Sequence, residues 1–229
     1  MREVEATLAR PLRHVAFGDA PNPSVIDIDA VRSAQLSHEP YDFFCGSNFL
    51  RQEAIDDLRR DFPDISKPGY LTVDEVSLRG RFKTLIDELE GAELTEALSQ
   101  KFGKNLHPHP RLTTIMRRSQ AKYGAIHTDS ASKIMTMLVY MNDAWQGDEG
   151  GRLRVLYDDK HYEPYAAEVP PTMGHVFAFL RSDRSWHGHK PFTGERKVVQ
   201  IAWVKDQAEL YRKKKRNAVA QVFKSMLRM

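Results

Sequence analysis

Residues 134–140 read Ile-Met-Thr-Met-Leu-Val-Tyr, and residues 198–204 read Val-Val-Gln-Ile-Ala-Trp-Val. Both runs are rich in the β-branched and aromatic residues that favour strands. Similar runs at 112–116, 151–156 and 175–180 are separated from them by Gly, Asp, Asn and Pro. Several short strands at this spacing, without alternating helices, indicate an antiparallel sandwich or jelly roll.

The chain before this β region is predicted to hold helices and one short strand. Residues 42–45, Asp-Phe-Phe-Cys, are an apolar run consistent with a strand. Apolar residues from Leu50 to Leu58 recur at helical spacing until Pro63 ends the pattern. Residues 72–75, Thr-Val-Asp-Glu, have the form of a capping box, so a second helix is expected to begin near Thr72 and to end at Gly91.

The predicted fold is mainly β with flanking helices, a double-stranded β-helix of the jelly-roll, cupin-like kind. Residues 1–110 would pack helices and strands on a core formed by residues 111–205. Residues 206–229 would return to a helix rich in Lys and Arg. Because neither repeats nor low-complexity tracts divide the chain, all three parts are expected to form one domain.

Composition limits the classes of protein to consider. The 229 residues include 34 Lys and Arg against 31 Asp and Glu, a net charge of +3 that excludes a wholly acidic or wholly basic binding protein. Cys45 is the single cysteine, so no internal disulfide can form, which favours a reducing compartment. The sequence shows neither the run of about 20 apolar residues of a membrane span nor a signal peptide. We expect a soluble, cytoplasmic protein.

A first candidate for chemistry is the triplet His127-Thr-Asp129. Alternate residues of a strand point to one face, so an imidazole and a carboxylate at this spacing can grip one ion. Alone the triplet is a weak signal, because a turn or a capped loop end explains most such sequences. A third ligand is needed.

Residues 185–189, Ser-Trp-His-Gly-His, supply two imidazoles, His187 and His189, after the run at 175–180. One of them with His127 and Asp129 would form a two-histidine, one-carboxylate site, which suits non-haem Fe(II) because it leaves positions open for a co-substrate and O₂. Arg196, beside the run at 198–204, adds a bidentate partner for a carboxylate. A zinc hydrolase has no obvious need for such an arginine.

At this point the sequence resembles the 2-oxoglutarate- and Fe(II)-dependent dioxygenases, particularly their prolyl-hydroxylase-like branch. The resemblance covers roughly residues 110–205. It rests on the following ordered set: His127-Thr-Asp129, Leu138-Val-Tyr140-Met-Asn142, Glu149-Gly-Gly-Arg-Leu, and Trp186-His187-Gly188 with Arg196.

The resemblance implies a role for each matching residue. His127, Asp129 and His187 match the iron ligands, and Arg196 matches the residue that pairs with the distal carboxylate of 2-oxoglutarate. Tyr140 occupies the place of a tyrosine whose hydroxyl meets the same carboxylate. The implied reaction hydroxylates a C–H bond with O₂ and releases succinate and CO₂.

Two residues near this set need a separate decision. His187 and His189 would share one face of a regular strand, and the family spacing to Arg196 favours His187 as the ligand, with His189 facing the substrate or supporting the site. Trp203 is separated from Arg196 by an odd number of positions, so in an unbroken strand it faces away and is left out of the site.

The substrate is less defined by the sequence. Basic residues are frequent near the expected mouth of the site: Arg117, Arg118, Lys133, Arg152, Arg154, Arg181 and Arg184. They form either a solvated rim or a site for a phosphate or carboxylate. We expect an anionic small molecule or glycoconjugate, with Arg117, Arg184 and His189 as candidate contacts. The segment 157–168 is a candidate lid.

Alternatives remain at this level. A prolyl or other peptide side chain is the second substrate class, and a cupin-like metal-binding protein or a zinc hydrolase is the alternative outside redox chemistry. The basic C-terminal segment is expected to pack on the barrel as an amphipathic helix. Peripheral contact with a membrane surface is the second reading for it, and nucleic acid ranks last because interleaved aromatic residues are sparse.

Overall fold

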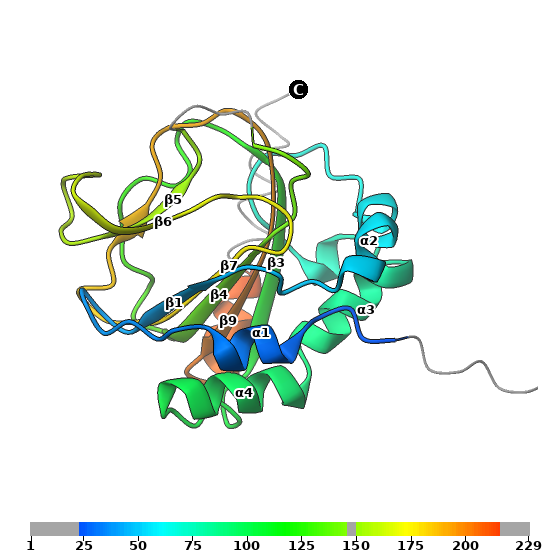
Figure 1. The fold of residues 1–229 in the computed structure, drawn as a ribbon, viewed down its shortest axis with the longest axis horizontal. Coiled ribbons are helices and arrows are strands. Elements are labelled where there is room, and N and C mark those ends of the chain that lie inside the picture. The colour runs from blue at the N-terminus through cyan, green and yellow to red at the C-terminus, as the bar shows by residue number, and fades with distance from the viewer. Residues whose placement is uncertain (1–22, 146–149, 216–229) are drawn as a thin grey trace, which may run out of the picture.

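A computed structural model describes residues 23–145 and 150–215 of the chain. Two antiparallel sheets face each other, and helices cover the outer side of the larger one (Figure 1). Among the described residues, no helix has the length and apolar character that a membrane crossing requires.

The larger sheet has six strands. In spatial order they are β1 (Phe43–Gly46), β7 (Val176–Leu180), β4 (Lys133–Tyr140), β9 (Gly194–Val204), β3 (Arg111–Ser119) and β2 (Leu71–Thr72). The smaller sheet contains β6 (Tyr165–Val169), β5 (Leu153–Leu156) and β8 (His187–Gly188). The paired strands within each sheet are antiparallel, so the predicted jelly roll with flanking helices is confirmed.

Alternation along the strands divides the apolar residues between two cores. On β4, Met135, Met137 and Val139 pack toward the helices, whereas Leu138 and Tyr140 pack between the sheets. Successive strand residues point to opposite faces, which is why a nearly continuous apolar run serves both cores. Polar residues on the inner face of the large sheet therefore meet the smaller sheet, and this is where the site forms.

Between residue 23 and β3, the structure has four helices and two short 3-10 turns. The helices are α1 (Ile28–Ser33), α2 (Ile55–Asp61), α3 (Gly80–Leu89) and α4 (Ala92–Phe102), and the turns are η1 (Gln52–Ala54) and η2 (Val73–Glu75). Phe82, Leu85, Ile86 and Leu89 bury one face of α3. Each such side chain contributes about 1.5 to 3 kcal/mol when fully buried.

The predicted start of the second helix was wrong. Thr72 and Glu75 do form the capping box, but it closes only the turn η2, and α3 begins at Gly80. The oxygen Oδ2 of Asp61, at the end of α2, accepts the backbone N–H of Arg81 at 2.8 Å, so a residue from another helix satisfies the first turn of α3. Gly80 has φ +50°, and a Cβ there would lie 2.1 Å from the same oxygen.

Two further differences concern the ends of the β region. β9 begins at Gly194, so Arg196 lies inside the strand instead of before it. Residues 165–169, partly assigned to a candidate lid, are strand β6 paired with β5. Residues 157–164 form the connection that remains.

Candidate metal and co-substrate site

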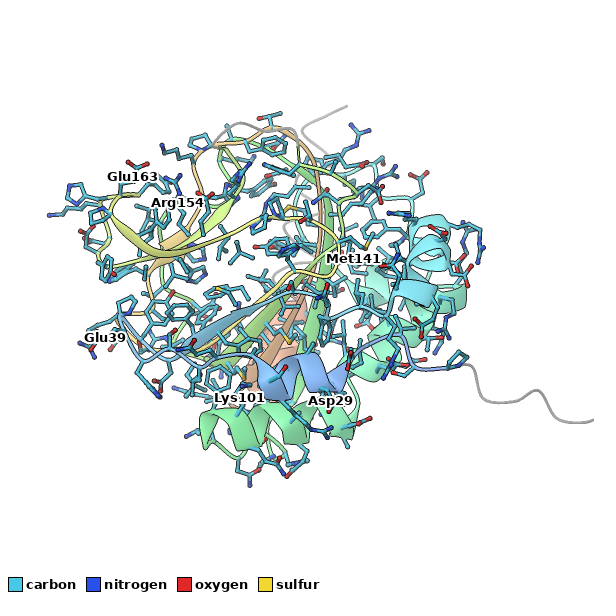
Figure 2. All side chains as sticks on the ribbon, in the orientation of Figure 1. Asp29, Glu39, Lys101, Met141, Arg154 and Glu163 are labelled. Carbon is cyan, nitrogen blue, oxygen red and sulfur yellow. The ribbon has the colours of Figure 1, made fainter. Side chains whose placement is uncertain are left out.

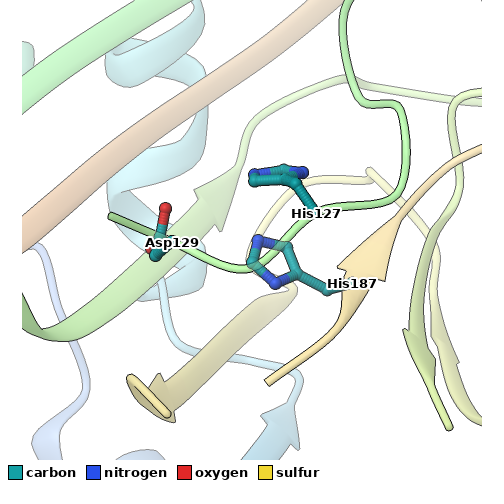
Figure 3. A group of neighbouring side chains, drawn as sticks. All are labelled: His127, Asp129 and His187. Atoms are coloured by element: carbon teal, nitrogen blue, oxygen red, sulfur yellow. The ribbon is translucent and has the colours of Figure 1, made fainter. Parts of the chain in front are cut away.

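His127 and His187 come together through their backbones. Each donates its N–H to the carbonyl oxygen of the other at 3.0 Å, an isolated antiparallel bridge that extends the small sheet beyond β8. Their imidazole rings are 4.4 Å apart between centroids, and the ligand atoms of His127, Asp129 and His187 lie within 4.8 Å of one another (Figure 3). The predicted convergence of these three side chains is present in the structure.

Hydrogen bonds set which nitrogen of each ring is free. Nδ1 of His127 lies 2.7 Å from the carbonyl oxygen of Ala125, and Nδ1 of His187 lies 2.9 Å from that of Ser185. A carbonyl only accepts, so both Nδ1 atoms carry a proton, and Nε2 is the nitrogen of each ring left to face a metal. Such bonds to the second nitrogen are the usual way in which a protein orients histidine ligands.

Asp129 is held by two residues of β4. Nζ of Lys133 donates to its Oδ1 at 2.8 Å, and Oγ1 of Thr136 donates to its Oδ2 at 2.5 Å. Burial would raise the pKa of this carboxyl, but Lys133, His187 and Thr136 together hold it well below its usual range. The carboxylate is therefore ionised and fixed in place.

Burial differs among the three groups. His127 is exposed, whereas Asp129 and His187 are buried. Burial, and then the neighbouring His127, lowers the pKa of His187 to about 4, so its imidazole is neutral near pH 7. A neutral imidazole is the form that binds a metal.

His189 does not join the cluster. Its backbone N–H donates to the carbonyl of Gly124 at 2.7 Å, and its Nδ1 donates to the carbonyl of Lys190 at 2.8 Å. Burial, followed by the charge of Arg196, lowers its pKa to about 4. Its buried ring thus supports the segment that leads into His127.

Arg196 lies on the inner face of β9 with an exposed fraction of 2%. Its Nε donates to the carbonyl of Gly151 at 3.0 Å, and its Nη2 donates to the Tyr140 hydroxyl at 3.2 Å. Among residues 23–145 and 150–215, no carboxylate forms an ion pair with it. Because an uncompensated buried charge is costly, the guanidinium is suited to a carboxylate from a ligand.

Sequence reasoning missed Tyr70 at this end of the site. Burial raises its pKa, and the Arg196 guanidinium, to which its hydroxyl is hydrogen-bonded, opposes that rise. Tyr70 lies just before the two-residue strand β2, where no motif or periodicity could have pointed to it. Two tyrosine hydroxyls therefore flank the guanidinium.

Trp203 is placed as expected. It packs with Ile201 and Val199 in the core beneath the helices, on the opposite face of β9 from Arg196. It takes no part in the site.

The residues fit both groups that the resemblance implies. Two imidazoles and one carboxylate form the donor set of a non-haem Fe(II) site. The buried Arg196, without a protein carboxylate among the described residues, fits one end of a dicarboxylate.

The predicted basic rim is largely neutralised. Arg117 pairs with Asp64 and Glu195, facing away from the cluster. Arg184 is exposed. The other partnerships are Arg152 with Glu168, Arg154 with Glu163 and Glu168, and Arg181 with Asp183. Figure 2 shows Arg154 on the small sheet and Glu163 in the connection before β6, and their side chains approach to 3.0 Å.

The segment after β9 continues as a helix over residues 207–215, and residues 216–229, which the basic-helix prediction also covers, lie outside the described residues. Nζ of Lys213 donates to Oγ of Ser130 at 2.7 Å, and Lys214 pairs with Asp74. The described part of this helix thus contacts the loop that carries Asp129.

Comparison with known proteins agrees with the site. Residues 113–205 match the model of the 2OG-Fe(II) oxygenase superfamily. A search of curated proteins found no match. The matched residues contain the inner strands, the His-Asp-His cluster and Arg196, and this part of the chain is similar to the Fe(II)- and 2-oxoglutarate-dependent enzymes of that superfamily.

Two similar solved structures are prolyl 4-hydroxylases. The protein from Phytophthora capsici has a TM-score of 0.56 and 18% identity, over 83% of this chain and 69% of that one. The protein from Pseudomonas putida has a TM-score of 0.51 and 18% identity, over 78% of this chain and 97% of that one. At this identity the likeness concerns the fold.

Proposed function

We propose that this enzyme uses O₂ and 2-oxoglutarate to hydroxylate an aliphatic C–H bond of a peptide or amino-acid side chain, with a prolyl ring as the first candidate. The observation that carries the reaction class is the cluster of His127, Asp129 and His187 in the part of the chain that is similar to this superfamily. The products are the hydroxylated substrate, succinate and CO₂.

In this proposal His127, Asp129 and His187 hold Fe(II), which with 2-oxoglutarate supplies the activation of O₂. Arg196 and Tyr140 bind the distal carboxylate of 2-oxoglutarate, and Tyr70 assists. The protein supplies orientation, since the carbonyls of Ala125 and Ser185 fix the two rings before any ligand arrives.

An aromatic wall supports an aliphatic substrate. The Phe179 ring centroid lies 4.6 Å from that of His187, and Tyr41 meets Phe179 edge-on at 6.0 Å. Phe177 stacks on Phe179 at 4.9 Å. These buried rings keep water away from the His187 side of the cluster, and such an apolar environment suits the oxidation of an aliphatic C–H bond.

The ion pairs of the rim weaken the expectation of a polyanionic substrate. Arg117, Arg152, Arg154 and Arg181 each have a carboxylate partner. A sugar phosphate or similar ligand would have to displace these partners first. The names of the two similar structures favour a prolyl side chain instead.

The test measures succinate release from 2-oxoglutarate with Fe(II), with and without a panel of prolyl peptides and free proline. We expect at least one member to raise succinate release and to gain one oxygen atom by mass spectrometry, and Asp129→Ala to abolish both. Stimulation by a phosphorylated sugar but by no proline compound would replace the proposed substrate class and keep the reaction class.

A further inference from the structure

Lys133 lies on the inner face of the large sheet only because of a break in strand pairing. The register of β4 against β9 shifts between Lys133 and Met135, so Lys133 lies opposite Val204 and Met135 opposite Trp203. Directly opposed residues share a face, and Trp203 packs toward the helices. The irregularity thus turns Lys133 to the face that carries Thr136, whereas simple alternation would have turned it outward.

The Lys133 ammonium is nearly buried and incompletely bonded. Its side chain is 10% exposed, and its hydrogen bond is to Asp129 at 2.8 Å. An ammonium has three N–H donors, so two of them have no partner among residues 23–145 and 150–215. The ligand atoms of Asp129 and His187 lie within 4.8 Å of one another, so the ammonium that contacts Asp129 lies beside the metal cluster.

The balance of buried charges indicates which kind of group the two remaining N–H donors of Lys133 bind. The buried charges of the site are Lys133, Arg196 and Asp129, which leave one excess positive charge. Among the described residues, Asp129 is the one carboxylate that shifts the pKa values of the surrounding tyrosines and histidines. Fe(II) and the 2-oxoglutarate dianion cancel each other, so the loaded site keeps that excess charge.

The two cations serve different ends of the site. Tyr140, which contacts Arg196, and Lys133 lie at opposite ends of β4, so their Cα atoms are roughly 23 Å apart by the rise of a strand. A five-carbon co-substrate with its distal carboxylate on Arg196 leaves Lys133 to another ligand.

We propose that Lys133 is a specificity-determining residue that binds a carboxylate of the substrate beside the metal site. A substrate carboxylate bound there would set which C–H bond of the substrate faces the metal. This inference rests on the proposed function in one respect, that 2-oxoglutarate occupies the Arg196 end.

The test requires no knowledge of the substrate. Protein loaded with Mn(II) and excess 2-oxoglutarate is titrated with acetate and separately with acetamide, its neutral isostere. Paramagnetic broadening of the methyl proton signal reports binding near the metal. We expect acetate to bind about tenfold more tightly than acetamide, the value of one charge-assisted hydrogen bond, and Lys133→Met to remove that preference.

Matched variants separate an effect of the Lys133 charge from a general effect of removing a lysine. Lys67→Met removes an exposed lysine outside the site and should keep the acetate preference, and Lys133→Arg should keep it as well. If the methionine variant fails to fold, Lys133→Gln gives the same readout. Free Mn(II), measured by electron paramagnetic resonance, corrects for any change in metal loading.

Three outcomes would overturn the proposal. The first is equal binding of acetate and acetamide by the parent protein, and the second is an acetate preference that survives in Lys133→Met. The third is a parent protein without an acetate preference whose Lys133→Met variant binds 2-oxoglutarate more weakly. The last would assign Lys133 to the co-substrate. Binding of 2-oxoglutarate is followed independently by absorbance of the Fe(II) complex. If the parent protein shows no such absorbance at all, that result would instead contradict the proposed function.

Discussion

The Nε2 atoms of His127 and His187 are free for a metal because the backbone carbonyls of Ala125 and Ser185 hold both Nδ1 protons, at 2.7 and 2.9 Å. His127 and His187 also exchange backbone hydrogen bonds with each other at 3.0 Å. The metal site is therefore built into the pairing of the small sheet, and its ligands are oriented before a metal binds.

Thr136→Val should weaken metal binding. The threonine hydroxyl donates to Asp129 at 2.5 Å, and loss of a bond that orients a ligand typically costs about 10- to 100-fold in metal affinity. Valine keeps the shape and the β propensity of threonine. Titration with Co(II) followed by visible absorbance measures the change; an unaltered affinity would show that Lys133 alone fixes the carboxylate.

Arg196→Met should weaken 2-oxoglutarate binding without lowering the stability of the ligand-free protein. Loss of the guanidinium is expected to weaken 2-oxoglutarate binding by about 100-fold. Replacing a buried charge that lacks a carboxylate partner with an apolar side chain is neutral or stabilising in the ligand-free protein. Calorimetric titration with 2-oxoglutarate and thermal unfolding measure the two effects, and a large fall in melting temperature would contradict the second.

Gly124→Ala should destabilise the loop that leads into His127. Gly124 has φ +80°, and an added Cβ would lie 1.9 Å from Nε2 of His189. We expect a loss of about 2 to 4 kcal/mol from backbone strain and the displaced imidazole. The double variant with His189→Ala should recover the part due to the contact. Denaturant unfolding of all three variants checks this, and strictly additive losses would exclude the contact.

Cys45 should react slowly with iodoacetamide. Burial raises the pKa of its thiol to about 12, against an ordinary value of 9.0. The folded chain therefore holds the proton where the unfolded chain releases it, and stability falls as pH rises above about 9. Alkylation at pH 8.5, followed by mass spectrometry, should be far slower in native than in urea-unfolded protein. Equal rates would place the thiol in an accessible environment.

Much of the β core was predictable because its residues carry a strong local signal. The runs around residues 134–140 and 198–204 became β4 and β9, and their alternation explains why Trp203 and Arg196 lie on opposite faces. The His127-Thr-Asp129 spacing could be read from the sequence, although His127 lies in an isolated bridge and Asp129 in the loop after it, and the choice of His187 over His189 rested on the family resemblance.

Other features depend on contacts between distant segments. The start of α3 is determined by Asp61 of another helix, so the capping box at Thr72 gave the wrong boundary. α4 and β6 were missed, and β6 owes its form to pairing with β5. The orientation of Lys133 follows from a register shift, and Tyr70 reaches Arg196 from a segment without a motif. No local pattern encodes these relationships.

The central claim is that His127, Asp129, His187 and Arg196 together hold Fe(II) and 2-oxoglutarate. Anaerobic addition of 2-oxoglutarate to the Fe(II)-loaded protein tests it most directly, because chelation produces a weak charge-transfer band in the visible spectrum. The account predicts that band in the parent protein and its loss in Asp129→Ala. Metal-loaded parent protein that shows no band at saturating 2-oxoglutarate would contradict the account.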